Sequence, residues 1–414
     1  MEPRRVVVTG MGTVNPLGNS VAESWDAVVN RRSGIAEITR FDASHLSCRI
    51  AGEVKNFDYT AYFDGEMAKK AKRMDHFCHY AVAAAAEAVD QAGVSDLEHL
   101  NRIGVGVGSG IGGLNVQHEN SVALETRGAR RVSPFYIPMS IGNMASGLLS
   151  MKYGFTGPNI SLQTACATAN HSIAMSQLII RSGMADLMIA GGSEGVVDEL
   201  AIAAFANMRA LSSRNDDPQG ASRPYDRDRD GFVLSEGAAI LVLEEYEHAR
   251  KRGAPILCEV RACGLSGDGY DFVAPDPEGR GAALAMRMAL DQAQLSPNDV
   301  DYVNTHGTST PVGDIAEING VYDLFRDSAD RTYVGSTKSY HGHLLGATAG
   351  LEAILTISAM RHGIVPANLN LENPDPELPD IRIPTEAVET PIRAAISNSF
   401  GFGGHNSSLV LAQL

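Results

Sequence analysis

An α/β fold, in which helices cover both faces of a buried sheet, is predicted by two features of the 414-residue sequence. First, short apolar runs that end in glycine alternate with helical segments from one end of the chain to the other. Second, these runs are continuously apolar, which is typical of a mainly parallel sheet shielded by helices. The earliest runs are RVVVTG (5–10), RIGVGVG (102–108) and DLMIAGG (186–192).

Helices of the first half have ordinary start and stop signals. Ser20 and Glu23 form a capping box before a helix over 21–30. Glycine ends two further helical segments, because it readily adopts the left-handed conformation found after a helix. The two segments are 79–93 and 161–183, and the second begins as a short strand. A third segment, 238–253, is predicted to begin as a strand and to continue as a helix.

The second half repeats the alternation. One strand is expected at the start of 255–267, and two others are expected over 301–307 and 332–338. Helices are expected over 279–295 and 344–363. The segment 393–414 is expected to form two strands joined by a glycine-rich turn. A domain boundary is expected near Gly253–Pro255. The predicted units are therefore an N-terminal half, 1–254, and a C-terminal half, 255–414.

Composition and charge argue against several classes of protein. A net charge of −15 disfavours nucleic-acid binding. No run approaches the roughly 18 apolar residues of a membrane span, and the N-terminus lacks the apolar core of a signal peptide. The cysteines are scattered without metal-ligand spacing, so neither disulfides nor a zinc site is expected and a cytoplasmic protein is indicated. They are Cys48, Cys78, Cys166, Cys258 and Cys263.

Cys166 is the first candidate for chemistry. It lies in QTACATAN (163–170), between a short strand and a helix of small residues. Unpaired N–H groups and the positive end of the dipole at a helix start favour a thiolate, and they could also hold an oxyanion. A buried, inert cysteine is the alternative explanation.

Two histidines occupy comparable positions. His306 follows a predicted strand in NTHGTSTPVGD (304–314), and His343 lies at a strand–helix junction in STKSYHGHLLGATAG (336–350). The carboxyl ends of parallel strands are where α/β sheets bind ligands. Each histidine alone could be a turn residue, but two of them beside glycines, with a similar cysteine, indicate one site.

Lys338 and Glu352 form a candidate ion pair. Lys338 directly follows the strand before His343, and Glu352 lies among apolar neighbours in the next helix. A carboxylate in such surroundings needs a partner, which Lys338 could supply. A solvent-exposed glutamate is the alternative.

Two glycine-rich segments have less specific meanings. SNSFGFGGHN (397–406) is typical of a tight hairpin and allows close backbone approach. GSGIGG (108–113) matches a dinucleotide-binding pattern but opens a poor helix, so a nucleotide site is disfavoured.

These motifs, in this order, resemble the β-ketoacyl-[acyl-carrier-protein] synthases of the elongating type, with the central segment most similar to class II. Further matches are MRALSSRND and SRPYDRDRDGFVLSEGAAILVLEEYEHARKRGA, and the resemblance covers essentially the whole chain. It implies the thiolase fold, in which two similar α/β halves form five layers, α-β-α-β-α. It also implies a homodimer that works with acyl-carrier protein and needs neither metal nor cofactor.

The resemblance assigns a role to each candidate. Cys166 would take an acyl group as a thioester, and His306 and His343 would stabilise the enolate formed when a malonyl thioester loses its carboxylate. Backbone N–H groups of Cys166 and Phe402 would form the oxyanion hole, and Lys338 and Glu352 would set the charge around the histidines. The expected activity is a two-carbon decarboxylative condensation in the biosynthesis of fatty acids or of related polyketides and polyenes.

The same resemblance implies binding residues. Thr308 and Thr310 match residues that bind the pantetheine arm, and Phe402 matches a gating residue. The remaining substrate positions are Ile111, Phe205 and Phe400. The basic residues expected to dock the acidic carrier protein are Lys69, Lys70, Lys72, Arg73, Arg130 and Arg209, although a solvated helix face would also explain the first four.

Five positions depart from the family pattern. His405 replaces the threonine of GFGGTN, Tyr340 and His341 replace Met-Thr, Asp271 stands where histidine is expected, and Tyr136 replaces an apolar aromatic residue of the acyl pocket. These changes leave chain-length preference, and a housekeeping or specialised role, open.

Three other enzyme classes and one partner subunit fit the sequence less well. A thiolase would need a second cysteine near the C-terminus, and the last one here is Cys263. An initiating synthase would use Cys-His-Asn, which the two histidine motifs contradict. A non-catalytic chain-length subunit would lack Cys166, and an NAD-dependent enzyme depends on GSGIGG alone.

Overall fold

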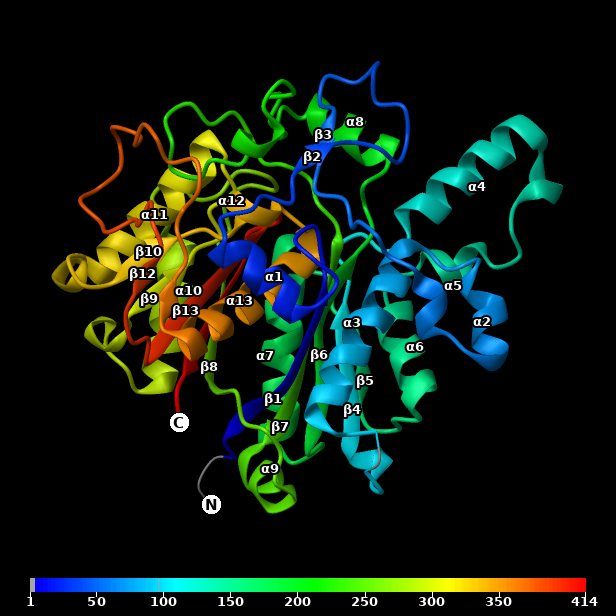
Figure 1. The fold of residues 1–414 in the computed structure, drawn as a ribbon, viewed down its shortest axis with the longest axis horizontal. Helices are drawn as coiled ribbons and strands as arrows, with labels where there is room; N and C mark the ends of the chain where they lie inside the picture. Colours follow the sequence, from blue (N-terminus) through cyan, green and yellow to red (C-terminus); the bar gives the residue numbers. More distant parts are fainter. Residues whose placement is uncertain (1–3, 96) are drawn as a thin grey trace.

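The computed structural model describes residues 4–95 and 97–414, and its main sheet contains two sets of five strands with the same internal order (Figure 1). The full order is β10-β9-β13-β14-β8-β1-β7-β6-β4-β5. The N-terminal set is β1 (Val6–Val14), β4 (Ile103–Gly108), β5 (Asn159–Ile160), β6 (Leu187–Glu194) and β7 (Gly237–Glu245). The C-terminal set is β8 (Cys258–Gly267), β9 (Tyr302–Asn304), β10 (Tyr333–Gly335), β13 (Ala394–Gly401) and β14 (His405–Ala412).

The two sets also share strand directions. In the first, β1–β7 and β7–β6 are antiparallel whereas β6–β4 and β4–β5 are parallel. In the second, β8–β14 and β14–β13 are antiparallel whereas β13–β9 and β9–β10 are parallel. The expectation of a mainly parallel sheet was therefore wrong. Buried antiparallel strands are as continuously apolar as parallel ones when helices cover both faces, so the pattern could not distinguish them.

Helices form three layers around these strands. α7 (Thr168–Arg181) and α13 (Thr348–His362) lie between the two sets, where α7 contacts β6 and α13 contacts both β7 and β13 (Figure 1). α3 (His76–Ala92) covers β1 and β7, and α10 (Arg280–Ala293) covers β8 and β14. α6 (Met144–Tyr153) lies beside α3, and α11 (Pro311–Phe325) lies beside α10. The predicted five-layered arrangement is thus present.

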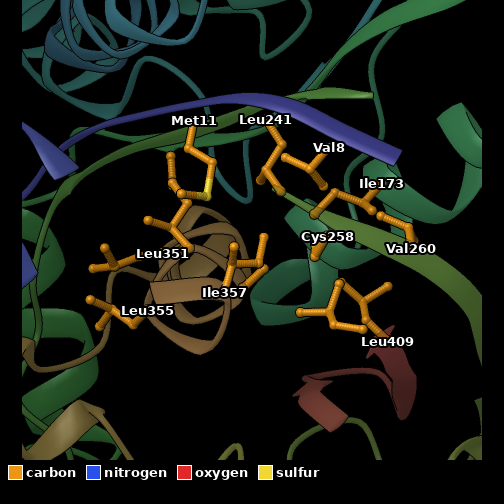
Figure 2. Close-up of a cluster of buried hydrophobic side chains, with 14 of the residues drawn as sticks. Val8, Met11, Ile173, Leu241, Cys258, Val260, Leu351, Leu355, Ile357 and Leu409 are labelled. Carbon is orange, nitrogen blue, oxygen red and sulfur yellow. The ribbon is translucent and has the colours of Figure 1, made fainter. Parts of the chain in front are cut away.

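The central core lies between the two sets. Figure 2 shows Leu241 of β7 and Leu409 of β14 on opposite sides of Ile173 in α7 and Leu351 in α13. All four side chains are fully buried. At about 25 cal/mol per Å² of apolar surface, this burial is a main contribution to stability, and it holds the two halves together.

Glycine permits the same close packing in both halves. A Cβ on Gly10 of β1 would stand 2.1 Å from the carbonyl oxygen of Ala88 in α3. A Cβ on Gly264 of β8 would stand 1.9 Å from the carbonyl oxygen of Ala285 in α10. Small residues on both elements therefore let each outer helix lie directly against its strand.

The remaining elements are mostly peripheral. The helices are α1 (Val21–Val29), α2 (Gly65–Ala71), α4 (Leu114–Arg127), α5 (Tyr136–Ser140), α8 (Glu199–Asn207), α9 (Tyr246–Arg252) and α12 (Lys338–His341). The strand pairs are β2 (Ala36–Glu37) with β3 (Ile50–Ala51), and β11 (Ile364–Val365) with β12 (Val388–Glu389). Within the described ranges, no helix combines the length and apolar character that crossing a membrane requires.

Two sequence expectations need local correction. Ser20 caps α1 through its hydroxyl, which accepts from the N–H of Glu23, but the Glu23 carboxylate accepts from the N–H of Asn19 instead of completing the capping box. The strand expected at the start of 161–183 is β5, which ends at Ile160. The residues between β5 and the turn of Cys166 are irregular, and they carry the chain from the sheet edge to α7.

Candidate active site

Parallel strands bring the predicted residues to one edge of the sheet. β9 is parallel to both β10 and β13, so the segments that follow these strands leave the sheet on the same side. These segments carry His306, Lys338, His343 and Phe402. Cys166 follows β5, which is parallel to β4 in the other set. A cavity of about 550 Å³ at this edge is lined by both histidines, Cys166 and Phe402.

Cys166 lies in a 3-10 turn, Ala165–Ala167, that leads directly into α7. Its side chain is 6% exposed, and Ala165 has a φ of 49°, which marks a sharp turn before the cysteine. Burial raises the pKa of the Cys166 thiol to about 11, and the Lys338 charge and the Phe402 N–H oppose this rise only in part. The N–H groups at the helix start favour the thiolate as expected, but burial outweighs them, and the thiol is protonated near neutral pH.

His343 is the nearest basic group to the thiol. Its Nε2 lies 3.1 Å from Cys166 Sγ, and its Nδ1 lies 2.9 Å from the hydroxyl of Thr348 at the start of α13. Burial lowers the pKa of His343 well below 6.5, and the Lys338 charge lowers it further. The imidazole is therefore neutral, with one nitrogen able to donate and the other able to accept.

His306 is held by its backbone. The N–H groups of His306 and Gly307 donate to the two carboxylate oxygens of Glu317 at 2.8 and 2.7 Å. The ring of His306 meets that of His343 edge to face, with centroids 5.3 Å apart and planes at 83°. Burial, followed by the Lys338 charge, lowers the pKa of His306 well below 6.5.

Glu317 was missed by the sequence reasoning. It is 4% exposed within α11, and burial raises its pKa to about 7. The one available signal was a carboxylate among small and apolar residues in the helix PVGDIAEIN, shortly after the first histidine motif. Its function in the geometry is to fix the turn that presents His306.

Lys338 and Glu352 are brought together as the pair that the sequence suggested. Lys338 Nζ lies 2.6 Å from Glu352 Oε1, and both side chains are buried. Burial raises the pKa of Glu352 to about 8, and the Lys338 charge opposes that rise. The same charge lowers the pKa of both His306 and His343. The Lys338 charge therefore lowers the pKa of Glu352, His306 and His343 together.

The ligand atoms of Cys166, His306 and His343 all lie within 4.8 Å of one another. This spacing suits a metal ion as well as a shared substrate. A lysine ammonium at the same site opposes a second cation. The cluster therefore fits an acyl substrate with developing negative charge better than a metal.

Two backbone N–H groups also face the sulfur. Those of Phe402 and of Cys166 itself both interact with Sγ and favour its charged form. Phe402 begins the turn between β13 and β14, and the two glycines that follow it have φ of 84° and 72°. A Cβ on Gly401 would stand 2.7 Å from the carbonyl oxygen of Thr164. Glycine is therefore required for this turn to approach the nucleophile.

Glu194, at the end of β6, is a second buried carboxylate that the sequence reasoning missed. It accepts four hydrogen bonds of 2.8–3.1 Å from the Ser109 hydroxyl and the N–H groups of Gly110, Ile111 and Gly346. Burial raises its pKa to about 7. The backbone N–H groups of GSGIGG (108–113) that a phosphate would need already donate to Glu194. The alternative of a dinucleotide-binding site was therefore wrong.

Both halves of the chain match models of a single family. Residues 3–249 match the Beta-ketoacyl synthase, N-terminal domain, and residues 257–372 match the Beta-ketoacyl synthase, C-terminal domain. The chain belongs to the β-ketoacyl synthase family. The predicted family, the thiolase-like fold and the condensing acyltransferase function are thereby confirmed.

Individual relatives support the same membership. The 3-oxoacyl-[acyl-carrier-protein] synthase 2 of Vibrio harveyi is 48% identical over 417 residues, and that of Coxiella burnetii is 47% identical over 415, each match covering 100% of both chains. A solved β-ketoacyl synthase from Burkholderia phymatum is 34% identical with a TM-score of 0.92, covering 99% of this chain and 100% of that one. The ishigamide ketosynthase/chain length factor is 32% identical with a TM-score of 0.90 and full coverage of both.

In this β-ketoacyl synthase, all the residues expected to bind substrate line the same cavity. The hydroxyls of Thr308 and Thr310 lie 3.0 Å apart on its wall. Cys166 is the one cysteine that lines the cavity in the described part of the chain, and Cys263 is buried in the central core. The thiolase alternative, which needs a second cysteine as base, has no such residue here. The other lining residues predicted from sequence are Ile111, Phe205, Phe400 and Phe402.

The predicted basic residues are exposed but fall into separate groups. Arg73 follows α2, and its guanidinium lies 4.4 Å from the ring centre of Phe135, close to α5. Arg130 lies in the turn after α4, and Arg209 follows α8 and lines the cavity. Lys69, Lys70 and Lys72 are also exposed. The synthase therefore presents Arg209 at the cavity and the remaining cations on the α2–α5 side of the molecule.

The unusual residues of this synthase do not line the cavity. His405 is exposed, and its ring meets that of His171 edge to face at 6.2 Å. Asp271 is exposed and caps its own loop by accepting from two backbone N–H groups. Tyr136 begins α5, outside the cavity of the single chain. Tyr340 and His341 are fully buried in α12.

Proposed function

We propose that this chain extends an acyl group on Cys166 by two carbons taken from malonyl-carrier protein, with loss of carbon dioxide. The observation that supports this most directly is the 3.1 Å approach of His343 Nε2 to Cys166 Sγ beside a second neutral histidine. Neutral imidazoles, a thiol and two convergent backbone N–H groups suit acyl transfer followed by enolate formation.

In the first step, the Cys166 thiol attacks the acyl-carrier thioester. Its proton passes by way of His343 Nε2 to the departing pantetheine sulfur, and an acyl–Sγ bond replaces the acyl–pantetheine bond. The N–H groups of Cys166 and Phe402 stabilise the tetrahedral oxyanion. Because a hydroxyl can donate or accept, Thr348 supports either tautomer of His343. The thiol is therefore activated during attack, without a thiolate being stored beforehand.

In the second step, His306 and His343 donate hydrogen bonds to the thioester carbonyl of the malonyl group. The carboxylate leaves as carbon dioxide, and the electron pair of the broken bond forms the enolate. The enolate carbon attacks the acyl–Cys166 carbonyl, and the sulfur leaves as a thiolate that takes a proton from solvent water. Lys338, paired with Glu352, keeps both histidines neutral by opposing a further positive charge.

The binding roles follow from the cavity. Thr308 and Thr310 would bind the pantetheine arm near the histidines, and Ile111 and Phe205 would contact the acyl chain. Phe400, near the end of β13, and Phe402, on the turn that supplies an oxyanion N–H, line the same cavity. We also propose that 1–254 supplies the nucleophile and 255–414 supplies both histidines, as two halves of one site.

A homodimer is part of the proposal. β5 is an edge strand of the main sheet, and apolar side chains near it are exposed, including Ile137 (61%), Ile141 (41%) and Met151 (61%). Exposed edges and apolar patches of this kind are normally covered by a partner. The basic groups on α2, Arg130 and Arg209 would then dock an acidic carrier protein, and the buried free cysteines suit a cytoplasmic setting.

Intact-mass analysis tests the proposed function. The protein is incubated with a series of acyl-carrier proteins and then with malonyl-carrier protein. An acyl mass on Cys166 that disappears as β-ketoacyl product forms is the expected result, and the series gives the chain-length preference. A protein that takes up no acyl chain from the series would be a partner subunit, and the proposal would be wrong.

A further inference from the structure

His341 has no role in the proposed reaction, yet it is fully buried one residue before the glycine that precedes His343. Its Nδ1 lies 2.8 Å from the carbonyl oxygen of Gly342, and its Nε2 lies 3.3 Å from the hydroxyl of Thr337. It is outside the cavity lining, so it does not touch substrate.

The contacts fix the state of this ring. A carbonyl oxygen only accepts, so Nδ1 must carry the hydrogen. Burial lowers the pKa of His341 to about 3, and the Lys338 charge acts in the same direction, so the ring is neutral and Nε2 accepts from the Thr337 hydroxyl. Asn304 Nδ2 in turn lies 3.3 Å from Thr337 Oγ1, to which it can donate. A continuous set of hydrogen bonds therefore links Asn304, Thr337, His341 and Gly342.

Each partner in this chain of hydrogen bonds is close in sequence to a residue of the active site. Asn304 is two residues before His306, and Thr337 directly precedes Lys338. Gly342 directly precedes His343. One buried ring thus joins the backbone segments that present both histidines and the lysine.

We propose that His341 is a positioning residue for enolate formation. It sets the placement of the His306 and His343 rings relative to each other. Enolate formation needs both rings at once, whereas acyl transfer uses His343 alone and is affected less. This inference rests on the proposed decarboxylative function. Displacements of a fraction of an ångström at such donors are costly because hydrogen bonds to an oxyanion depend steeply on geometry.

The test separates the two half-reactions in the full-length protein. His341→Leu keeps the ring's approximate volume and removes both hydrogen bonds, whereas His341→Asn retains a donor near Nδ1. We expect His341→Leu to lower kcat for carbon dioxide release from malonyl-carrier protein about tenfold, which is about 1.4 kcal/mol. KM and the rate of Cys166 acylation should stay within about twofold of wild type. His341→Asn should recover part of the loss.

Tyr340→Phe is the matched control, because Tyr340 is buried in the same short helix and its ring lies in the central core. It should leave both half-reactions unchanged. Equal losses of acylation and decarboxylation in His341→Leu, together with a lower Tm, would mean a purely structural role and would overturn the proposal, as would unchanged decarboxylation. Absence of decarboxylation in the wild type would instead contradict the proposed function itself.

Discussion

The Nε2 atom of His343 lies 3.1 Å from the Sγ atom of Cys166, although 177 positions separate the two residues in the chain. Each residue comes from a different half of the molecule, and both follow strands whose carboxyl ends meet at the cavity. The approach places a neutral imidazole beside a protonated thiol. The chemistry therefore depends on the interface between the halves.

Replacing Cys166 should separate condensation from decarboxylation. Cys166→Ala removes the nucleophile and should abolish product formation. Cys166→Gln should still release carbon dioxide from malonyl-carrier protein, because enolate formation uses the histidines and not the sulfur. Product analysis and carbon dioxide release measure the two steps. Condensation by purified Cys166→Ala would rule out the assignment of the nucleophile.

Replacing either histidine should lower the rate of decarboxylation more than the acylation of Cys166. His306→Ala and His343→Ala each remove one donor to the malonyl carbonyl, and loss of one such donor typically costs about 10²–10³ in rate. Both variants should still accept an acyl group on Cys166, which intact mass detects, but His343→Ala should do so more slowly because its Nε2 carries the thiol proton. Normal decarboxylation by either variant would contradict its role.

Removing the Lys338 charge should shift the acid limb of the pH–rate profile of decarboxylation to higher pH. In the wild type, burial and the Lys338 charge hold the pKa of both histidines well below 6.5, so the neutral donors persist as pH falls. In Lys338→Met the burial remains but the charge is lost, so each pKa rises and activity declines at a higher pH than in wild type. The pH profile of carbon dioxide release measures this. An unchanged acid limb would show that Lys338 does not control the histidines.

Gly401, which directly precedes Phe402, should tolerate no side chain. In Gly401→Ala, the new Cβ would stand 2.7 Å from Thr164 O and 3.1 Å from Cys166 N, so the turn must move away from the nucleophile. We expect at least about a tenfold loss of Cys166 acylation, equivalent to about 1.4 kcal/mol. Gly147→Ala in α6 is the control, since its Cβ meets nothing within 4 Å. Equal acylation rates in the two variants would argue against the proposed oxyanion hole.

Glu317 should make stability depend on pH. Its pKa is raised from 4.5 to about 7 by burial, so the folded protein binds more protons than the unfolded chain between these values. Its contribution to the free energy of unfolding is therefore greatest below about pH 4.5 and falls as pH rises through about 7. Urea denaturation of wild type and Glu317→Gln from pH 5 to about 8 measures the difference. A difference that grows in favour of wild type with rising pH would contradict the raised pKa.

Local patterns were sufficient for many elements and for the main catalytic candidates. Glycine after a helical run located the ends of α3 and α13, and the motifs around Cys166, His306 and His343 identified the family. Strand direction was less accessible. The apolar runs of β1, β7 and β14 resemble parallel strands because helices bury both of their faces, and burial leaves no trace of direction in the sequence.

The sequence by itself determined the alternation of strands and helices, the glycines that allow close packing, and the residue types needed for acyl transfer. The tertiary structure decided the partnerships of the buried charges. Glu194 accepts from the N–H of Gly346, 152 positions away, and Glu317 accepts from the turn of His306, 11 positions before it. The Cys166 thiol is protonated because burial outweighs the helix start. Desolvation and long-range hydrogen bonding depend on what surrounds a group in three dimensions, and a linear pattern carries no direct record of those surroundings.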